Sequence, residues 1–169
     1  MTTPLLAQLK QLEATLQAHP GTSYRRKKWE SLFGQIGLAL CEPHRDYCDE
    51  SPPNLLTFAE TGGESVHFGW VCEQQTPSDD TPVAICLPDV GITEIIAPTF
   101  REFLAIGCEH GWGHLEQLAY DREACLRAYQ SKPPPEDWLW PQKANILQAL
   151  RRELGISWRP LREPCPLPR

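Results

Sequence analysis

The sequence lacks long apolar runs and paired cysteine motifs, and these absences exclude several classes of protein. No window of its 169 residues approaches a membrane span. Lys10 and Glu13 lie where a signal peptide needs its apolar centre, so we expect a cytoplasmic protein. The seven cysteines are odd in number and include no Cys-x-x-Cys pair. Free thiols are therefore expected rather than a disulfide framework.

Positive charge is also scarce. The chain has 16 lysines and arginines against 22 aspartates and glutamates, which gives a net charge of -6. This balance repels nucleic acid and anionic lipid at long range. The basic run at residues 25–28 is short and is typical of a solvated helix face. We therefore expect neither a nucleic-acid nor a membrane partner.

The chain does have a folded protein's share of apolar residues, 41%, and it is unusually rich in proline, with 17. Its length suits one domain with a substantial core. The prolines indicate that much of that domain is loop or interrupted structure.

Helical patterns occupy the first 41 residues. Thr3-Pro4 is a strong helix start, followed by leucines at helical spacing up to Leu16. A second helix is predicted to open at residue 22 or 23 and to bury four apolar side chains: Trp29, Phe33, Ile36 and Leu40.

Strand patterns occupy residues 55 to 97. The Gly62-Gly63 pair predicts a tight turn that leads into a strand over 65–73, which carries His67 and Phe68. An apolar run at 83–87 is typical of a central strand, and 92–97 is a third candidate.

Helices are predicted again over 99–155, before a proline-rich tail at 156–169 that we expect to be extended or frayed. Thr99 is a predicted cap, and Gly155 a predicted end, of helices in this part. Grouped strands and segregated helices predict a single α+β domain, 1–169, with an antiparallel sheet flanked by N- and C-terminal helices.

Two cysteine–histidine clusters have spacings that suggest metal binding. The first is Cys41, His44 and Cys48, and the second is Cys108, His110 and His114. Neither contains the paired cysteine knuckle typical of zinc sites. We therefore expect no bound metal and no cofactor, with these cysteines as small buried hydrophobes.

Catalysis has two candidate sites. His67 is a possible general base, oriented by Glu64 or Glu60, and Cys108 with His110 is a possible thiol–imidazole pair. The structural alternative for His67 is a ring that hydrogen-bonds a neighbouring backbone group.

Three of the six tryptophans are candidates for an exposed binding surface. Trp112 stands between two glycines, and Trp138 and Trp140 follow a proline spacer. Tryptophan is enriched in interface hot spots, although most large aromatic residues are buried in the core.

Three segments resemble one family. The stretch 58–70, the proline-bounded strand 82–88, and the helices at 100–108 and 115–119 resemble bacterial Smi/Knr-like proteins of the SUKH superfamily, over about residues 55–121. Ser65 stands where that family's pattern has glycine, and Glu64 where it often has aspartate.

The resemblance implies an antiparallel sheet wrapped by helices and a non-catalytic role. Many bacterial members are immunity proteins that bind and neutralise a toxin. We therefore expect a non-enzymatic, protein-binding domain, either an immunity protein or a regulator. The alternative is a small hydrolase-like or metal-binding enzyme that uses His67 with Glu64, or the Cys108/His110/His114 cluster.

Overall fold

A computed structural model describes residues 2–18, 31–63, 65–73, 76–131 and 141–167. Its centre is an antiparallel sheet of six strands that are neighbours in chain order. The strands are β1 (Ala39–His44), β2 (Leu55–Glu60), β3 (His67–Val71), β4 (Val83–Leu87), β5 (Ile92–Ala97) and β6 (Cys165–Pro166). The predicted α+β fold is therefore confirmed.

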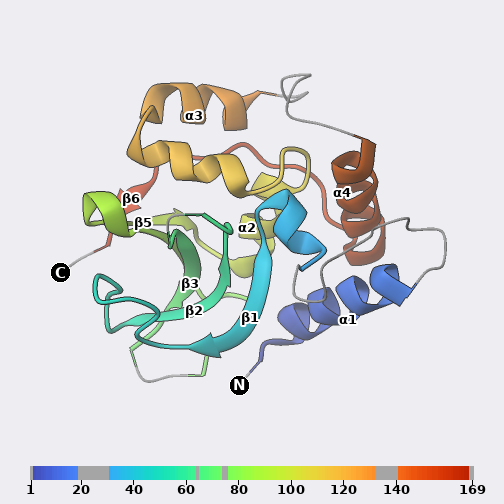
Figure 1. The fold of residues 1–169 in the computed structure, drawn as a ribbon, viewed down its shortest axis with the longest axis horizontal. Coiled ribbons are helices and arrows are strands. Elements are labelled where there is room, and N and C mark those ends of the chain that lie inside the picture. Colours follow the sequence, from blue (N-terminus) through green and yellow to red (C-terminus); the bar gives the residue numbers. More distant parts are fainter. Residues whose placement is uncertain (1, 19–30, 64, 74–75, 132–140, 168–169) are drawn as a thin grey trace.

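The α-helices gather on one face of the sheet and at one end of it (Figure 1). They are α1 (Pro4–Ala18), α2 (Phe100–Gly107), α3 (Arg122–Gln130) and α4 (Pro141–Leu154). Short 3-10 helices are η1 (Phe33–Ile36), η2 (Pro88–Val90) and η3 (Gly113–Ala119). The N-terminal α1 packs against α4, although almost the whole chain separates them. Among the described residues, no helix has the length and apolar content needed to cross a membrane.

The core lies between the sheet and α2 and is built from aromatic rings. Phe58 of β2 and Trp70 of β3 have ring centroids 4.4 Å apart. Phe58 also meets Phe100 of α2 at 5.0 Å, and Phe68 meets Phe103 at 5.0 Å. Because strand side chains alternate, Phe68 and Trp70 share this face, while His67 and Gly69 point to the other.

The predicted helix caps and the predicted glycine turn are confirmed by hydrogen bonds between residues that are close in the sequence. Thr3 accepts a bond from the backbone N–H of Leu6 at the start of α1, and Thr99 accepts one from Glu102 at the start of α2. The Gly62-Gly63 turn closes with mutual bonds between the 61–63 backbone and Val66. Gly155, with a φ of 59°, follows the last residue of α4.

The prediction of a second helix reaching residue 41 is wrong. Within the part of that segment the structure describes, Phe33 and Ile36 are buried, as predicted, but they belong to the one-turn η1. Gly37 then takes a left-handed conformation, with φ of 72°, and turns the chain into β1. Leu40 and Cys41 are therefore strand residues. Trp29 lies outside the described residues.

The C-terminal tail is extended, as predicted, but over 156–167 it is not frayed. It runs from α4 back past α3 to the far edge of the sheet (Figure 1). Leu161 of the tail is buried, and its N–H donates to the carbonyl oxygen of Tyr129 at 3.2 Å. Cys165 and Pro166 then form β6, which pairs with β5. A segment without helical or alternating pattern thus gains its order from the surface it covers.

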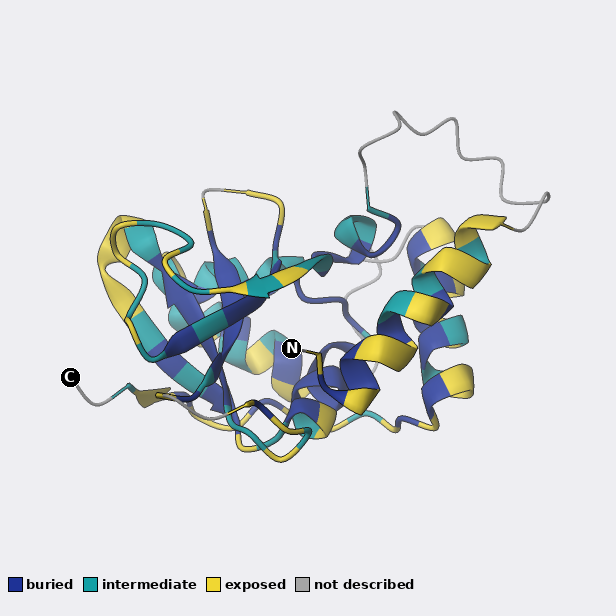
Figure 2. Cartoon of the chain, turned by 90° about the horizontal axis from the view of Figure 1, so that it is seen from below, coloured by how far each residue is buried: buried dark blue, intermediate teal, exposed yellow. Residues whose placement is uncertain are grey.

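The second face of the sheet has a thinner cover. Leu55 packs against Ala84 and Cys86 there, and a Cβ on Gly69 would lie 2.6 Å from Leu55 Cγ. The loop 45–54, between β1 and β2, brings Tyr47 and Ser51 against His67 on this face. Figure 2 shows the sheet as mostly buried, with exposed residues concentrated in the connecting loops and on the outer side of α1.

Candidate functional site

His67 is fully buried on the second face of the sheet, and both its ring nitrogens have partners. Nδ1 lies 2.8 Å from the carbonyl oxygen of Ser65, and Nε2 lies 3.0 Å from the hydroxyl of Ser51. A carbonyl can only accept, so Nδ1 carries the hydrogen and Nε2 accepts from Ser51. Burial lowers the pKa of His67, which favours this neutral form.

Tyr47 and Glu60, which lie near the Ser51–His67 contact, hydrogen-bond each other rather than His67. Tyr47 stacks on the His67 ring at 4.5 Å between centroids, and its hydroxyl donates to the carboxylate of Glu60. Burial, followed by that carboxylate, raises the pKa of Tyr47. Glu60 is therefore not the group that orients His67, and Glu64 lies outside the described residues.

Ser51 and Arg45 are site residues that sequence reasoning missed. The Ser51 hydroxyl also accepts a bond from the backbone N–H of Cys48, at 3.1 Å. Arg45 donates to three backbone carbonyls, those of Pro53, Cys72 and Glu73, at 2.6 to 2.9 Å. Nothing in the local sequence marks these residues, because every partner but Cys48 and Pro53 comes from another element. Together they hold the loop 45–54 over His67.

Chemically, the Ser51–His67–Ser65 chain is a hydroxyl donor, a neutral imidazole and an orienting carbonyl. It is the order found when a serine is activated by a histidine base. It is equally the order needed to satisfy a buried histidine and anchor a loop. The structure bears out the predicted backbone bond of His67.

The first cysteine–histidine cluster is dispersed by the fold. Burial, with Glu60 nearby, raises the pKa of the Cys41 thiol to about 11. His44 is exposed and its Nδ1 lies 2.7 Å from the carbonyl oxygen of Glu42. Cys48 contacts the Ser51 hydroxyl through its thiol, at 3.3 Å.

The second cluster is also divided among separate contacts. The Cys108 thiol donates to the carbonyl oxygen of Ala105 at 3.2 Å. The buried His110 ring lies 5.2 Å from the Tyr129 ring, and burial lowers its pKa. The backbone carbonyl oxygen of His114 accepts from the Cys125 thiol at 3.5 Å. Across the described ranges, no three cysteine, histidine or acidic side chains are placed to hold a metal ion.

Trp112 is not a surface residue, and the prediction that it offers a binding surface is wrong. Its side chain is 0% exposed, and its indole N–H donates to the carbonyl oxygen of Phe103 at 3.2 Å. A Cβ on Gly107 would lie 2.1 Å from the indole, so this helix glycine makes room for it. The surrounding glycines thus mark close packing rather than an exposed turn. Trp138 and Trp140 lie outside the described residues.

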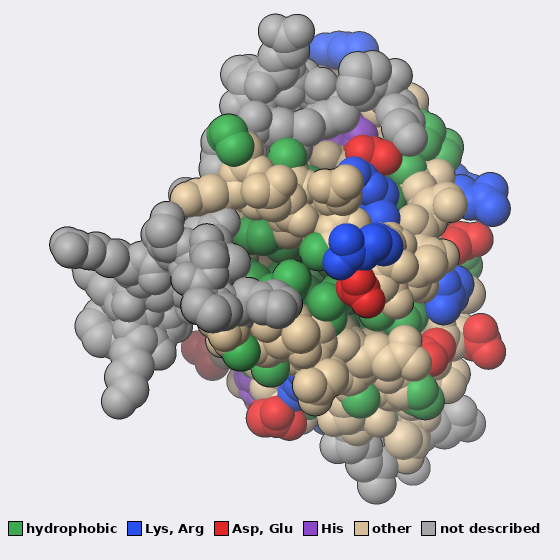
Figure 3. All heavy atoms as spheres, turned by 90° about the vertical axis from the view of Figure 1, so that its right-hand side faces the viewer, with side chains coloured by type: hydrophobic (Ala, Val, Ile, Leu, Met, Phe, Trp, Pro, Cys, Tyr) green, Lys and Arg blue, Asp and Glu red, His purple; other side chains and the backbone are tan. Residues whose placement is uncertain are grey.

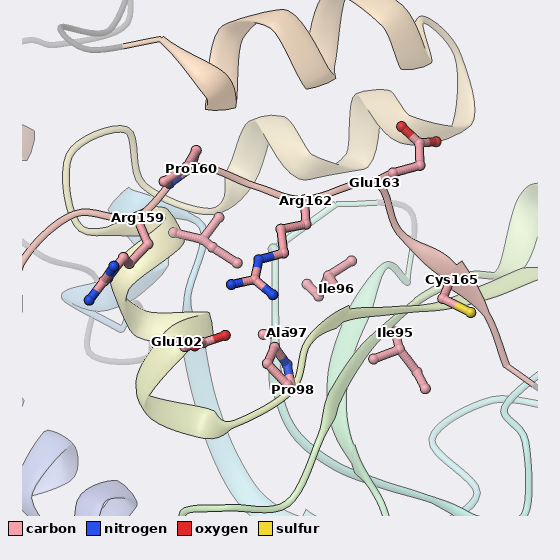
Figure 4. Close-up of a pocket in the computed structure, with 11 residues that line it drawn as sticks. Ile95, Ile96, Ala97, Pro98, Glu102, Arg159, Pro160, Arg162, Glu163 and Cys165 are labelled. Atoms are coloured by element: carbon pink, nitrogen blue, oxygen red, sulfur yellow. The ribbon is translucent and has the colours of Figure 1, made fainter.

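A hollow of about 310 Å³ opens where β5 ends, between α2 and the tail (Figure 4). Ile96, Ala97 and Ile106 form its buried apolar floor. Arg159 and Arg162 are exposed and line the hollow from the tail; Figure 4 shows the Arg162 guanidinium pointing into the hollow, whereas the Arg159 side chain lies at its rim and points away from the floor. Within the described part of the chain, neither arginine forms an ion pair.

A second depression, of about 570 Å³, lies between α1 and α4. Hydrophobic side chains gather in it (Figure 3), among them Leu12, Leu16 and Leu154. Its arginine is already engaged, because Arg152 pairs with Glu153 at 2.7 Å. The hollow beside β5 therefore differs in that its two arginines form no ion pair with a described residue.

Comparison with known proteins gives no relative for this chain: no family model, no curated protein and no solved structure matches it.

Proposed function

We propose that this chain is a non-enzymatic, cytoplasmic protein-binding domain whose binding surface is the hollow beside β5. The observation that carries the proposal is the pair Arg159 and Arg162 beside an apolar floor. Arginine is enriched in binding hot spots because its planar guanidinium combines apolar contact with directed hydrogen bonds. Protein interfaces have this composition, with an apolar centre and a polar rim.

The resemblance of residues 58–70 to SUKH-superfamily proteins supports the same type of role. It favours a toxin or a regulated protein as the partner, and it carries no contact residue over to this chain. The fold itself is compatible with many functions, so the surface and not the sheet bears the proposal.

Photocrosslinking from the hollow tests this proposal. A photoreactive phenylalanine analogue replaces Arg162 in one variant and the exposed Gln148 of α4 in a second, both expressed in the source cells. We expect a defined adduct from position 162 alone. The crosslinked protein is then identified, purified and titrated calorimetrically against the wild-type chain.

Charge reversal provides the decisive comparison. Arg162→Glu should weaken the purified complex at least about tenfold, because each lost interfacial charge pair contributes on the order of 1.4 kcal/mol or more. Arg152→Glu, on the α1–α4 side, is the matched control and should bind like wild type. Equal adducts from both positions, or unchanged affinity of Arg162→Glu, would contradict the proposal.

A hydrolase is the second candidate, favoured by the 3.0 Å contact between Ser51 and His67. In that reading Ser51 Oγ attacks an acyl or phosphonyl centre while its proton passes to His67 Nε2. A fluorophosphonate probe would then form a Ser51–phosphorus bond and release fluoride. Labelling of wild type but not of Ser51→Ala would support it, and unlabelled wild type would remove it. No contact described above favours Cys108, His110 and His114 as an alternative centre.

A further inference from the structure

Some of the charged side chains around the hollow beside β5 form ion pairs, and others do not. Glu163 is held by Arg122 at 2.9 Å, and Arg122 also binds the buried Glu94 at 2.8 Å. Glu102 lies in the first turn of α2, where the helix dipole compensates a negative charge. Among described residues, Arg159 and Arg162 have no such compensation. The lining holds two arginines and two glutamates, so the hollow has no net excess of either charge, and Arg159 and Arg162 are distinguished by forming no ion pair with a described residue.

The backbone that carries these arginines is fixed by the fold. The N–H of Arg159 donates to the carbonyl oxygen of Ala105 at 3.1 Å, and the N–H of Leu161 donates to that of Tyr129 at 3.2 Å. Cys165 is then paired with β5. An arginine on a held backbone loses less conformational freedom on binding than one on a free tail.

The floor and the volume limit what can enter. Ile96, Ala97 and Ile106 offer apolar contact, without a polar side chain among them. About 310 Å³ is near the lower end of ligand sites, which span roughly 300–1,000 Å³. Such a space admits one or two side chains rather than a large cofactor.

We infer that the hollow binds a partner segment in which an aspartate or glutamate lies beside an aliphatic side chain. The inference rests on the proposed function and names its partner's chemistry. The carboxylate meets the guanidinium group of Arg162, which points into the hollow and whose forked donors match its two oxygens, and Arg159 lies at the rim. The aliphatic side chain rests on Ile96, Ala97 and Ile106. An internal acidic residue is favoured because the hollow lies along the surface of the tail and can receive a chain that passes over it.

Blocked peptides titrated into the ¹⁵N-labelled full chain provide the test. The probe is acetyl-Gly-Ser-Leu-Glu-Leu-Glu-Ser-Gly-amide, and its control has glutamine in place of both glutamates. At low salt we expect shifts of the Ala97 and Ile106 amides and of the Arg159 and Arg162 Nε–H signals. The glutamine peptide should bind at least roughly fivefold more weakly, as should the acidic peptide to Arg162→Gln. Arg152→Gln should match wild type.

Four results would overturn the inference, three of them patterns of peptide binding and the fourth a complete absence of it. One is equal binding of the acidic and glutamine peptides, and another is a set of shifts centred away from the hollow. The third is tighter binding of the glutamine peptide with a free C-terminus, which would assign the site to a chain end. If neither blocked peptide binds while the crosslinked partner still depends on Arg162, the acidic-segment inference fails and the protein-binding function stands. If neither peptide binds and the crosslinked partner does not depend on Arg162, both the inference and the proposed function are wrong.

Discussion

The two faces of the sheet are held by different forces. On the helix-covered face, Phe58, Phe68 and Trp70 interlock with the phenylalanines of α2. On the loop-covered face, His67 is held by directed bonds to Ser51 and Ser65. Apolar packing depends on volume and is insensitive to pH, whereas the polar cover depends on hydrogen-bond partners and on the charge of one ring.

That difference matters for function because side chains that hold the fold together must be distinguished from side chains that are available to bind a partner. Ser51 and His67 lie at hydrogen-bond distance, as in a catalytic pair. The bonds of Ser51, however, also hold the loop 45–54 against the sheet. The hollow beside β5 is the reverse case, because the guanidinium groups of its arginines form no ion pair with the described residues. Four predictions test the contrast between the two faces, in order of decreasing effect.

Trp112→Ala tests the packed face and should cost about 3–5 kcal/mol, the usual range for truncating a large core aromatic residue. Chemical denaturation followed by far-UV circular dichroism measures the loss. Gln148→Ala, on the exposed side of α4, should stay within about 0.5 kcal/mol of wild type. A Trp112→Ala loss below about 1 kcal/mol would place that indole in solvent after all.

Gly107→Ala should lower the unfolding free energy by about 1–3 kcal/mol, because the new Cβ would overlap the Trp112 indole. Helix propensity alone predicts the opposite sign, a gain of up to about 1 kcal/mol. In the Trp112→Ala background the clash is absent, so Gly107→Ala should then be neutral or stabilising. The same loss in both backgrounds would show that the indole is not the cause.

Ser51→Ala tests the polar cover and should cost about 1–2 kcal/mol, since it leaves Nε2 of a buried histidine without its donor. Equilibrium denaturation at pH 7.5 measures the change. Ser157→Ala, at an exposed position beyond α4, is the matched control and should have little effect. A neutral Ser51→Ala would mean that water replaces the hydroxyl without penalty.

The smallest expected effect is pH dependence from His67. Because burial lowers its folded-state pKa, the unfolded chain binds the proton more readily. Stability from this group is therefore complete above about pH 6.5 and falls as the pH drops below it, with a slope of at most about 1.4 kcal/mol per pH unit. His110 acts in the same direction.

Comparison of His67→Gln with wild type at pH 7.5 and 5.5 isolates the share of His67. The variant should lose up to about 1 kcal/mol less than wild type over this interval. Identical losses would show that His67 is not the titrating group.

Sequence reasoning succeeded where neighbouring residues decide the structure. Thr3 and Thr99 cap helices with their own hydroxyls, and Gly62-Gly63 forms the turn between β2 and β3. Each of these structures depends on residues only a few positions apart, so the sequence alone predicts it.

Sequence reasoning failed where the contacting residues are distant from each other along the chain. The glycines beside Trp112 suggested a solvent-exposed turn, but they let residues 111 to 113 approach the chain at η1 and Gly37, and the indole packs on α2 at Gly107. Gly37 redirects the chain into β1, and β6 exists because the tail reaches β5. None of these contacts has a periodic or local signature.

The sequence by itself determined the α+β class, the starts of α1 and α2 and the turn at Gly62-Gly63, because capping, turn formation and side-chain alternation act within a few residues. Only the tertiary structure decided that His67 is bonded on both sides, that Trp112 is core, and that Arg159 and Arg162 lie beside the floor made by β5 and α2. Those outcomes depend on which distant surfaces meet, and burial free energy is gained only when the whole chain has folded.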